Sequence, residues 1–596
     1  MRGWRVWAAA LLMIAGIHAG MYAWMIPLWQ APDEPLLYEY AALTSRLGRI
    51  PDVNERDLAL EQALLQSLWE HSFWRYTTGQ MPPAAPQRLA EAEQLFFMPR
   101  QVGGDPPLYF LAAGGVLRLL AGWPLDAQAY ALRALNVLLL PGLVLVTLLI
   151  AREVVGRLPE GRIIAYAAAS LVALNPMLAA VTGAVGNDPL ANLIGALLTW
   201  RWLVALRQGV DRRRVIELAL LVLVGLLTKR TLMVFAVVLA AAGLIWMLRH
   251  QRRRVVVATA ALLLLAGSWL EGQIDPSTTW GWYWYGSHQQ VARVWPNDGS
   301  NPALQVRAGE LIVYPLAPTM VDQVRGGVFR FGMRVWDADH QAAIGRLVVF
   351  TDQQRHEVRF RAQPAGDQVE ISASVFPQTR GVLLGIEVDR GTIYADDLWA
   401  EGQGVQLLAN GGLNTPGLRS DGPLQDLLNY TRLNELFWAL AGGQLWHQLP
   451  ASWASVLFAS FWGHFGWMDI PFVLGSAWFG ILLAGCVVGS VAAGRLLLIR
   501  PASQIDRLWV VALLGSVAIT IVAVNSLILP QNQSLAQGRY LFPILPALAV
   551  VWASGAHSLV VWGRRQWVLG WLLIWLGGLA CLAGQAWLKL LSHYAG

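Results

Sequence analysis

The sequence has few cysteines and few charged residues. Only two cysteines, Cys486 and Cys581, occur among 596 residues, and both lie inside apolar runs. They support neither a disulfide framework nor a thiolate metal site. Charged residues make up 14% of the chain and hydrophobic residues 56%. This composition excludes an ordinary soluble protein and is typical of a polytopic membrane protein.

Several common functional motifs are also missing. No Walker, Rossmann or G-x-S-x-G pattern occurs in a convincing context. His71, His288, His447 and His464 show no ligand spacing, so no zinc site is predicted. The net charge of +6 does not indicate nucleic-acid binding, because the arginine clusters occupy short loops between apolar segments, where they orient a membrane protein.

Long apolar runs dominate what is present. At ~20 residues per crossing they predict a polytopic α-helical membrane protein with about 11–12 transmembrane helices. The predicted crossings are 6–28, 130–151, 162–182, 188–206, 214–228, 231–248, 253–271, 470–494, 507–528, 540–562 and 567–592, with 106–122 as a shorter candidate. The first run follows Arg2 and Arg5 and is too long for a signal peptide, so we interpret it as an uncleaved signal anchor.

The arginine clusters predict the orientation. They lie at 207–214, 249–254, 495–507 and 564–565. Placing them in the cytoplasm gives a consistent alternation from residue 162 to the end, with 29–105 and 272–469 outside. Arg152 and Arg157 also favour the cytoplasm, which allows one crossing between 106 and 151. Either 106–122 is re-entrant or interfacial, or the positive-inside rule fails there.

Residues 275–405 have a different pattern. Short alternating runs occur at 327–335, 345–350, 357–362, 369–375 and 382–388, and they end in a stretch at 393–401. They predict an inserted antiparallel β-sandwich whose last strand looks like that of jelly-roll carbohydrate-binding modules. The aromatic run 280–285 is interpreted as an interfacial belt.

The expected domains are therefore an N-terminal membrane module (1–274), the sandwich (275–405), an external helical segment (406–469) and C-terminal transmembrane helices (470–596). Within the first module, the external loop 29–105 carries helical patterns at 34–47, 55–70 and 87–97.

Two adjacent carboxylates follow the first apolar run. Asp33 and Glu34 stand between Pro32 and Pro35, where the chain leaves the bilayer. Acids at a membrane boundary are costly unless solvated or paired, which suggests a function. Alternatively, Asp33 is the N-cap of a helix that begins there, with Pro35 in its first turn.

Other polar motifs fall on the same predicted side of the membrane. They are Asp33, Glu34 and Glu39 in the first loop, then Asp105, Asn187, Asp188, Lys229, Arg230, His464, Trp467, Arg539 and Tyr540. Cations at helix ends suit a phosphate or diphosphate, and carboxylates suit deprotonation of a hydroxyl or metal binding. Each motif also has a structural interpretation: the cations can snorkel to headgroups, and Asn187-Asp188 can cap a helix.

Five of these motifs together resemble a family of bacterial polytopic membrane proteins. They are Pro32-Asp33-Glu34-Pro35, Pro106-Pro107-Leu108-Tyr109, Gly186-Asn187-Asp188, the run from Phe461 to Trp467, and Gln537-Gly538-Arg539-Tyr540. That family looks related to the GT-C glycosyltransferases, which include protein O-mannosyltransferases and aminoarabinose transferases of lipid A. The resemblance covers the membrane part in order and does not cover the β insertion.

The resemblance implies a GT-C-like fold in the bacterial inner membrane, with an extracytoplasmic active face. It implies transfer of a sugar from a polyprenyl-phosphate-linked donor to an external glycan, lipid or protein. Asp33 matches the catalytic acid position with Glu34 beside it, and which of the two is the base stays open. Arg539 would bind the donor phosphate, assisted by Lys229 or Arg230. Asp105 stands where many relatives carry histidine or lysine, which puts a cationic role there in doubt.

Two other functions stay open at this stage. One is a transporter or flippase for lipid-linked substrates, against which the long clean apolar segments weigh. The other is a non-catalytic surface protein that uses the β-sandwich to hold a glycan. The residues by themselves predict no resident cofactor. A divalent cation such as Mg or Mn at the carboxylates stays open, because some GT-C enzymes use one and others do not.

Overall fold

A computed structural model describes most of the chain. The described residues are 2–51, 55–87, 105–156, 160–233, 274–418 with short gaps, 453–499, 537–561 and 568–594, together with a few single positions. Within these ranges six helices are long and apolar enough to cross a membrane, and a seventh crossing results if one bent helix pair counts as a single segment. This number is typical of a multi-pass membrane protein.

The long helices match predicted crossings. They are α1 (Arg2–Met25), the continuous pair α7 (Leu125–Val137) and α8 (Leu139–Val155), α11 (Asp188–Gln208), α19 (Ala477–Ile499), the 3-10 turn η3 (Gly538–Ile544) with α21 (Leu545–Val561), and α22 (Val568–Tyr594). α12 (Arg212–Thr228) lies where the crossing 214–228 was predicted. The predicted crossings 231–248, 253–271 and 507–528 lie almost entirely outside the described residues.

The predicted crossing 162–182 is broken in two. α9 (Gly161–Leu174) and α10 (Pro176–Thr182) meet at an angle of 57°. Asn175 caps α10 by accepting a hydrogen bond from the Leu178 N–H (2.8 Å), and Pro176 occupies the first turn. A proline after a residue with extended backbone ends one helix and begins another, so this bend follows from the sequence.

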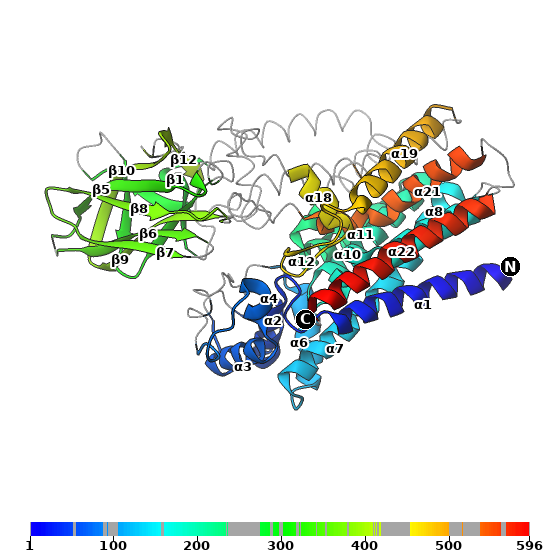
Figure 1. The fold of residues 1–596 in the computed structure, drawn as a ribbon. Helices are drawn as coiled ribbons and strands as arrows, with labels where there is room; N and C mark the ends of the chain where they lie inside the picture. Colours follow the sequence, from blue (N-terminus) through cyan, green and yellow to red (C-terminus); the bar gives the residue numbers. More distant parts are fainter. Residues whose placement is uncertain are drawn as a thin grey trace.

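The helices pack around α8, which contacts α1, α9, α11 and α21 (Figure 1). Two glycines allow close approaches. A Cβ at Gly183 would lie 2.7 Å from the backbone nitrogen of Ala23, and one at Gly195 would lie 2.5 Å from the Cβ of Pro543. Small residues at such crossings are common in membrane helix packing. These contacts bring the 182–188 corner against the end of α1, and η3 against α11.

The first loop forms α2 (Glu34–Leu47), α3 (Leu58–Glu70) and α4 (Phe73–Thr78), followed by α6 (Leu108–Leu119). The predictions of helices at 34–47 and 55–70 are confirmed, although α3 begins later because Asp57 caps it. The pattern at 87–97 lies almost entirely outside the described residues. α6 has 12 residues, about 18 Å at 1.5 Å per residue. It is too short to cross a bilayer, which agrees with the single crossing predicted between residues 106 and 151.

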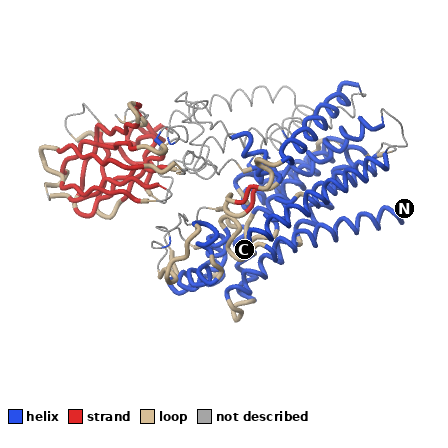
Figure 2. Tube along the Cα trace, in the orientation of Figure 1, coloured by secondary structure: helices blue, strands red, loops and turns tan. Residues whose placement is uncertain are grey.

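The inserted domain is an antiparallel β-sandwich (Figures 1 and 2). Its strands are β1 (Ile274–Trp284), β2 (Gln290–Val294), β3 (Ala303–Arg307), β4 (Leu311–Pro315), β5 (Val328–Asp337), β6 (Ile344–Thr351), β7 (Arg355–Arg361), β8 (Asp367–Ser374), β9 (Val382–Arg390), β10 (Thr392–Gly402), β11 (Val405–Gln406) and β12 (Pro416–Leu418). The predicted alternating runs are confirmed as strands β5 to β10.

The sandwich consists of two halves, β7-β6-β9-β4-β1 and β2-β3-β10-β5-β8, joined by the pairing of β1 with β2. Their inward side chains form a separate hydrophobic core. The interpretation of 280–285 as an interfacial belt is wrong for Trp282. This side chain is fully buried in that core, against Tyr314 and Phe331, because it occupies an inward position of β1.

A short hairpin precedes α19. α18 (Trp453–Trp462) leads into β13 (His464–Phe465), which pairs with β14 (Ile470–Pro471). The crossing predicted at 470–494 therefore begins only at Ala477. The Trp467 Nε1–H between the two strands donates to the carbonyl of Trp29 (3.2 Å), so the hairpin is attached to the first loop.

Candidate functional site

Asp33 lies between α1 and α2 with a left-handed backbone (φ 64°). The N-cap interpretation is correct for its position, but its side chain makes no cap hydrogen bond. An N-cap acid normally has extended backbone, from which it can reach the first turn. Here the carboxylate accepts a hydrogen bond from Nη2 of Arg539 (3.1 Å), a residue 506 positions later in the chain. A strained non-glycine residue is a common feature of functional sites.

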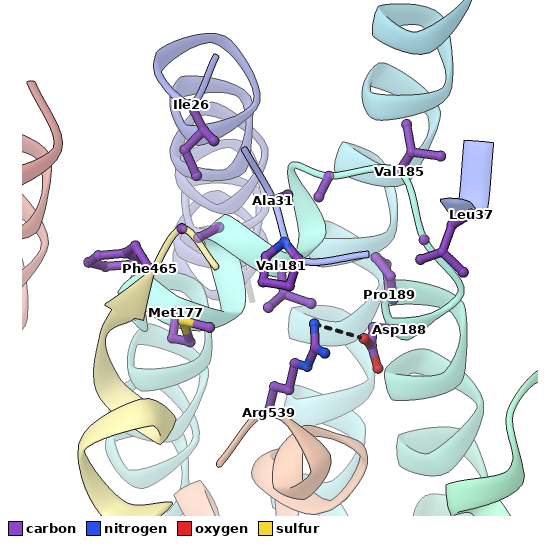
Figure 3. A pocket seen from close by; sticks show the side chains of 15 residues that line it. Ile26, Ala31, Leu37, Met177, Val181, Val185, Asp188, Pro189, Phe465 and Arg539 are labelled. Carbon is purple, nitrogen blue, oxygen red and sulfur yellow. Dashed lines mark ion pairs between the residues drawn. The ribbon is translucent and has the colours of Figure 1, made fainter. Parts of the chain in front are cut away.

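Asp33 is one member of an alternating chain of charges. Arg539 Nη1 lies 3.9 Å from Asp188 Oδ2, and Asp188 Oδ1 lies 2.5 Å from Lys229 Nζ. Figure 3 shows Arg539 of η3 pointing toward Asp188 at the start of α11. Two carboxylates and two cations thus meet, as the sequence predicted for Asp33, Asp188, Lys229 and Arg539. We call this set the charge relay of the site.

Arg539 is the central member of the charge relay. Its side chain is only 8% exposed, and its Nε has no hydrogen-bond acceptor among the described residues. The ring of Tyr540 lies 5.7 Å from the Arg539 guanidinium and 5.8 Å from Lys229 Nζ, within the range of a cation–π contact. Tyr540 thus contributes an aromatic wall beside both cations.

Gly538 determines where Arg539 lies. Its N–H donates to Ser460 Oγ (2.8 Å), and a Cβ at this position would lie 2.4 Å from the backbone nitrogen of Phe461 in α18. Only glycine allows this approach without a shift of the backbone. Gly538 therefore holds η3 against α18 and directs the next residue into the site.

We expect Gly538→Ala to lower stability by about 1–3 kcal/mol, the usual cost of overpacking a filled contact. The clash is with backbone, so η3 has to move and carry Arg539 away from Asp33. The measurement is thermal unfolding in detergent. Gly570→Ala is the matched control, because nothing lies within 4 Å of a Cβ there. Equal unfolding temperatures for the two variants would contradict the packing role.

Glu34 is in a very different environment from Asp33. Its side chain is fully buried and forms a bidentate ion pair with Arg133 of α7, at 2.7 Å (Oε1–Nε) and 2.5 Å (Oε2–Nη2). The backbone N–H groups of Trp29 and Val185 donate to the same carboxylate at 3.0 and 2.9 Å. All its acceptor positions are used by protein donors, so the role of Glu34 is structural: it joins the start of α2 to α7 and to the 182–188 corner.

Arg133 is the residue that sequence reasoning missed. Besides Glu34, it donates to the carbonyls of Ala23, Ile26 and Pro27 (2.9, 2.7 and 3.1 Å). These carbonyls lie at the end of α1 and directly after it, where a backbone carbonyl has no N–H donor within the helix. Arg133 thus joins α7, the end of α1 and the start of α2. An arginine inside an apolar run is itself a reason to expect a buried partner.

The 182–188 corner is fixed by polar contacts. Asn136 Nδ2 donates to the carbonyls of Ala184 (2.8 Å) and Gly186 (3.1 Å), and the Gly186 N–H donates to the Tyr109 hydroxyl (3.2 Å). Burial raises the pKa of Tyr109 to about 12, so the hydroxyl stays protonated. Asn187 Nδ2 donates to the carbonyl of Thr228 (3.3 Å), which holds the corner beside Lys229.

The remaining predicted residues make other contacts. Glu39 is buried in α2, and His464 is buried in β13. The Asp105 carbonyl accepts from the Tyr40 hydroxyl (3.3 Å). Trp467 packs edge-on against Phe73 of the first loop, with ring centroids 5.7 Å apart. The backbone of Arg230 begins the 3-10 turn η1 (Arg230–Met233), and its side chain lies outside the described part.

A small cavity borders the charge relay. Its volume is about 30 Å³, enough for one or two water molecules. Asp188 and Arg539 provide its polar wall, and most of the other lining side chains are apolar, among them Met177, Val181 and Phe465 (Figure 3). A charged wall faces an apolar one, which is the combination that a lipid with a charged headgroup requires.

The donor set fits an anion better than a metal ion. No group of three or more His, Cys, Asp or Glu residues close enough to hold a metal occurs in the described part of the chain. Asp33 and Asp188 each face a cation within the charge relay. Because Mg²⁺ and Mn²⁺ take several oxygen ligands, these residues as arranged do not fit a divalent cation, and no step is assigned to one.

Comparison with known proteins gives little further information. No family model and no curated protein matches the chain. Among solved structures, the CBM22-1–GH10 modules of Clostridium thermocellum endo-1,4-β-D-xylanase 10B in complex with xylohexaose match 22% of this chain and 28% of that chain, at 11% identity and a TM-score of 0.19. A similarity this low carries no functional argument. The fold and the charge relay define a multi-pass helical protein with an inserted β-sandwich.

Proposed function

We propose that this protein is a membrane glycosyltransferase. It would move a sugar from a polyprenyl-phosphate-linked donor to an extracytoplasmic acceptor, with Asp33 as the general base. The observation that carries this proposal is Arg539: a buried guanidinium with a spare N–H, hydrogen-bonded to a partly exposed carboxylate and bordering an apolar cavity. Arginine is well suited to phosphate because it binds bidentately and keeps its charge when buried.

The chemistry requires a base and a phosphate site next to each other. Asp33 takes the proton of an acceptor hydroxyl, and the hydroxyl oxygen attacks the anomeric carbon of the donor sugar. The bond between that carbon and the phosphate oxygen breaks, and the phosphate leaves with the electron pair. Arg539 and Lys229 neutralise the leaving phosphate. Attack from the face opposite the phosphate inverts the anomeric configuration.

Between the two candidate bases, the geometry favours Asp33. Its side chain is 36% exposed, so an acceptor from solution can reach it. Glu34 accepts four hydrogen bonds from protein groups and is fully buried. A general base has to come within hydrogen-bond distance of the proton that it removes. The contacts of Glu34 instead fix the backbone next to Asp33.

The test is a transfer assay in liposomes that contain the purified protein, a polyprenyl-phosphate-linked sugar and an external acceptor. We expect a covalent product, and we expect Arg539→Lys to lower the rate more than tenfold, because lysine keeps the charge but lacks the bidentate geometry. Movement of the lipid across the bilayer without product would instead support a transporter. Glycan binding with neither product nor lipid movement would support a non-catalytic surface protein.

A further inference from the structure

The charge relay is closed in this structure. Each cation already faces a carboxylate: Asp33 accepts from Arg539, and Asp188 lies between Arg539 and Lys229. The four charges sum to zero, so the charge relay by itself presents no excess positive charge to an anion. The outermost member is Asp33, at 36% exposure against 8% for Arg539. A phosphate on its way to Arg539 therefore meets a carboxylate first.

Arg539 nevertheless has unused binding capacity. A guanidinium has five N–H donors, and one nitrogen, Nε, has no acceptor among the described residues. Its Nη1 is 3.9 Å from Asp188, too far for a direct hydrogen bond. Only Asp33 accepts a hydrogen bond from this side chain within the described part of the chain. A phosphate group, with several charged oxygens, can satisfy more of these donors than a single carboxylate oxygen does.

The Asp33 carboxylate occupies a position that a phosphate on Arg539 needs. It accepts the hydrogen bond from Nη2 of the guanidinium. The cavity that borders Arg539 and Asp188 measures about 30 Å³, which is space for one or two water molecules and not for a phosphate. A phosphate that binds Nη2 of Arg539 therefore has to take the place of the Asp33 carboxylate.

The two neighbouring acids differ in their freedom to move. Glu34 accepts four hydrogen bonds from three different segments of the chain. Among the described residues the Asp33 carboxylate accepts one, from Arg539, and it does not cap α2. Rotation of its side chain therefore breaks a single contact, while the adjacent residue keeps the backbone in place.

We propose that Asp33 is a latch on the phosphate site. The donor phosphate displaces the carboxylate from Arg539, and the released carboxylate then becomes free to accept the proton of the acceptor hydroxyl. This inference rests on the proposed function and adds an order to it. The donor binds before the Asp33 carboxylate becomes available as a base. No acceptor hydroxyl is therefore deprotonated while the donor site is empty.

The test compares the affinity of wild type and Asp33→Asn for farnesyl diphosphate, followed by tryptophan fluorescence in detergent. The latch predicts that Asp33→Asn binds about tenfold more tightly than wild type, because the competing charge is gone. Asp33→Ser should show the same gain. Arg539→Gln should lose the binding. Glu55→Gln is the matched control, since it removes the same charge from the first loop, at the surface pair with Arg49.

The outcomes separate the latch from the proposed function. Equal or weaker binding by both Asp33 variants overturns the latch, even when wild type makes product in the transfer assay. A tenfold gain supports the latch, even when wild type transfers no sugar, and the failed transfer then counts against the proposed function alone. Inorganic pyrophosphate is measured beside the lipid. A gain for both probes assigns the effect to the phosphate, and a gain for farnesol would overturn the latch.

Discussion

Replacing Asp33 with asparagine is expected to abolish sugar transfer while the protein stays folded. Asparagine has nearly the same shape but cannot accept the proton of the acceptor hydroxyl. General base catalysis typically contributes about 10²–10⁴-fold, so transfer should fall by at least about 100-fold. Folding should be little affected, since the side chain is 36% exposed and makes a single hydrogen bond within the described part of the chain. A partly exposed ion pair contributes only about 0–1 kcal/mol.

The measurement is the initial rate of product formation in liposomes, with the thermal unfolding of the same preparation recorded beside it. Glu55→Gln again serves as the control, because it changes the same charge on the same loop in the surface pair with Arg49. Transfer by Asp33→Asn at the wild-type rate would exclude this residue as the base. A parallel loss of transfer and folding would make its role structural.

The local structure of this chain could be predicted well from its sequence. The helix at 34–47 and strands β5 to β10 lie where the patterns placed them, because hydrophobic periodicity reports directly on local backbone. The break at Asn175 could also have been predicted, since proline follows it. The late start of α19 could not, because it depends on the pairing of Phe465 with Ile470.

The candidate site was predicted in part. Asp33, Asp188, Lys229 and Arg539 meet, because they occupy ends of helices that the positive-inside rule places on the same face. Their pairing pattern was not predictable, since Asp33 and Arg539 are 506 residues apart. The burial of Glu34 was not predictable either, because its partner Arg133 lies 99 residues away. An arginine beside an apolar run predicts a buried partner but does not say which residue it is.

The second large effect is expected at Arg133. Arg133→Met should lower stability by about 3–5 kcal/mol, the typical cost of removing one partner from a buried ion pair. Glu34 would keep its charge at a position with no exposure, and the carbonyls of Ala23 and Ile26 would lose their donor. Transfer should be lost as well, because the backbone that carries Asp33 would no longer be fixed.

Arg133→Met combined with Glu34→Gln tests whether the loss arises from the unpaired charge. Methionine and glutamine leave no charge at this site, so the double variant should unfold at a higher temperature than Arg133→Met alone. Arg49→Ala, which breaks the surface pair with Glu55, should cost less than about 1 kcal/mol. If Arg133→Met unfolded at the wild-type temperature, the pair would not anchor α2. If the double variant were less stable than the single one, the unpaired-charge explanation would fail, and the lost hydrogen bonds to the end of α1 would account for the effect.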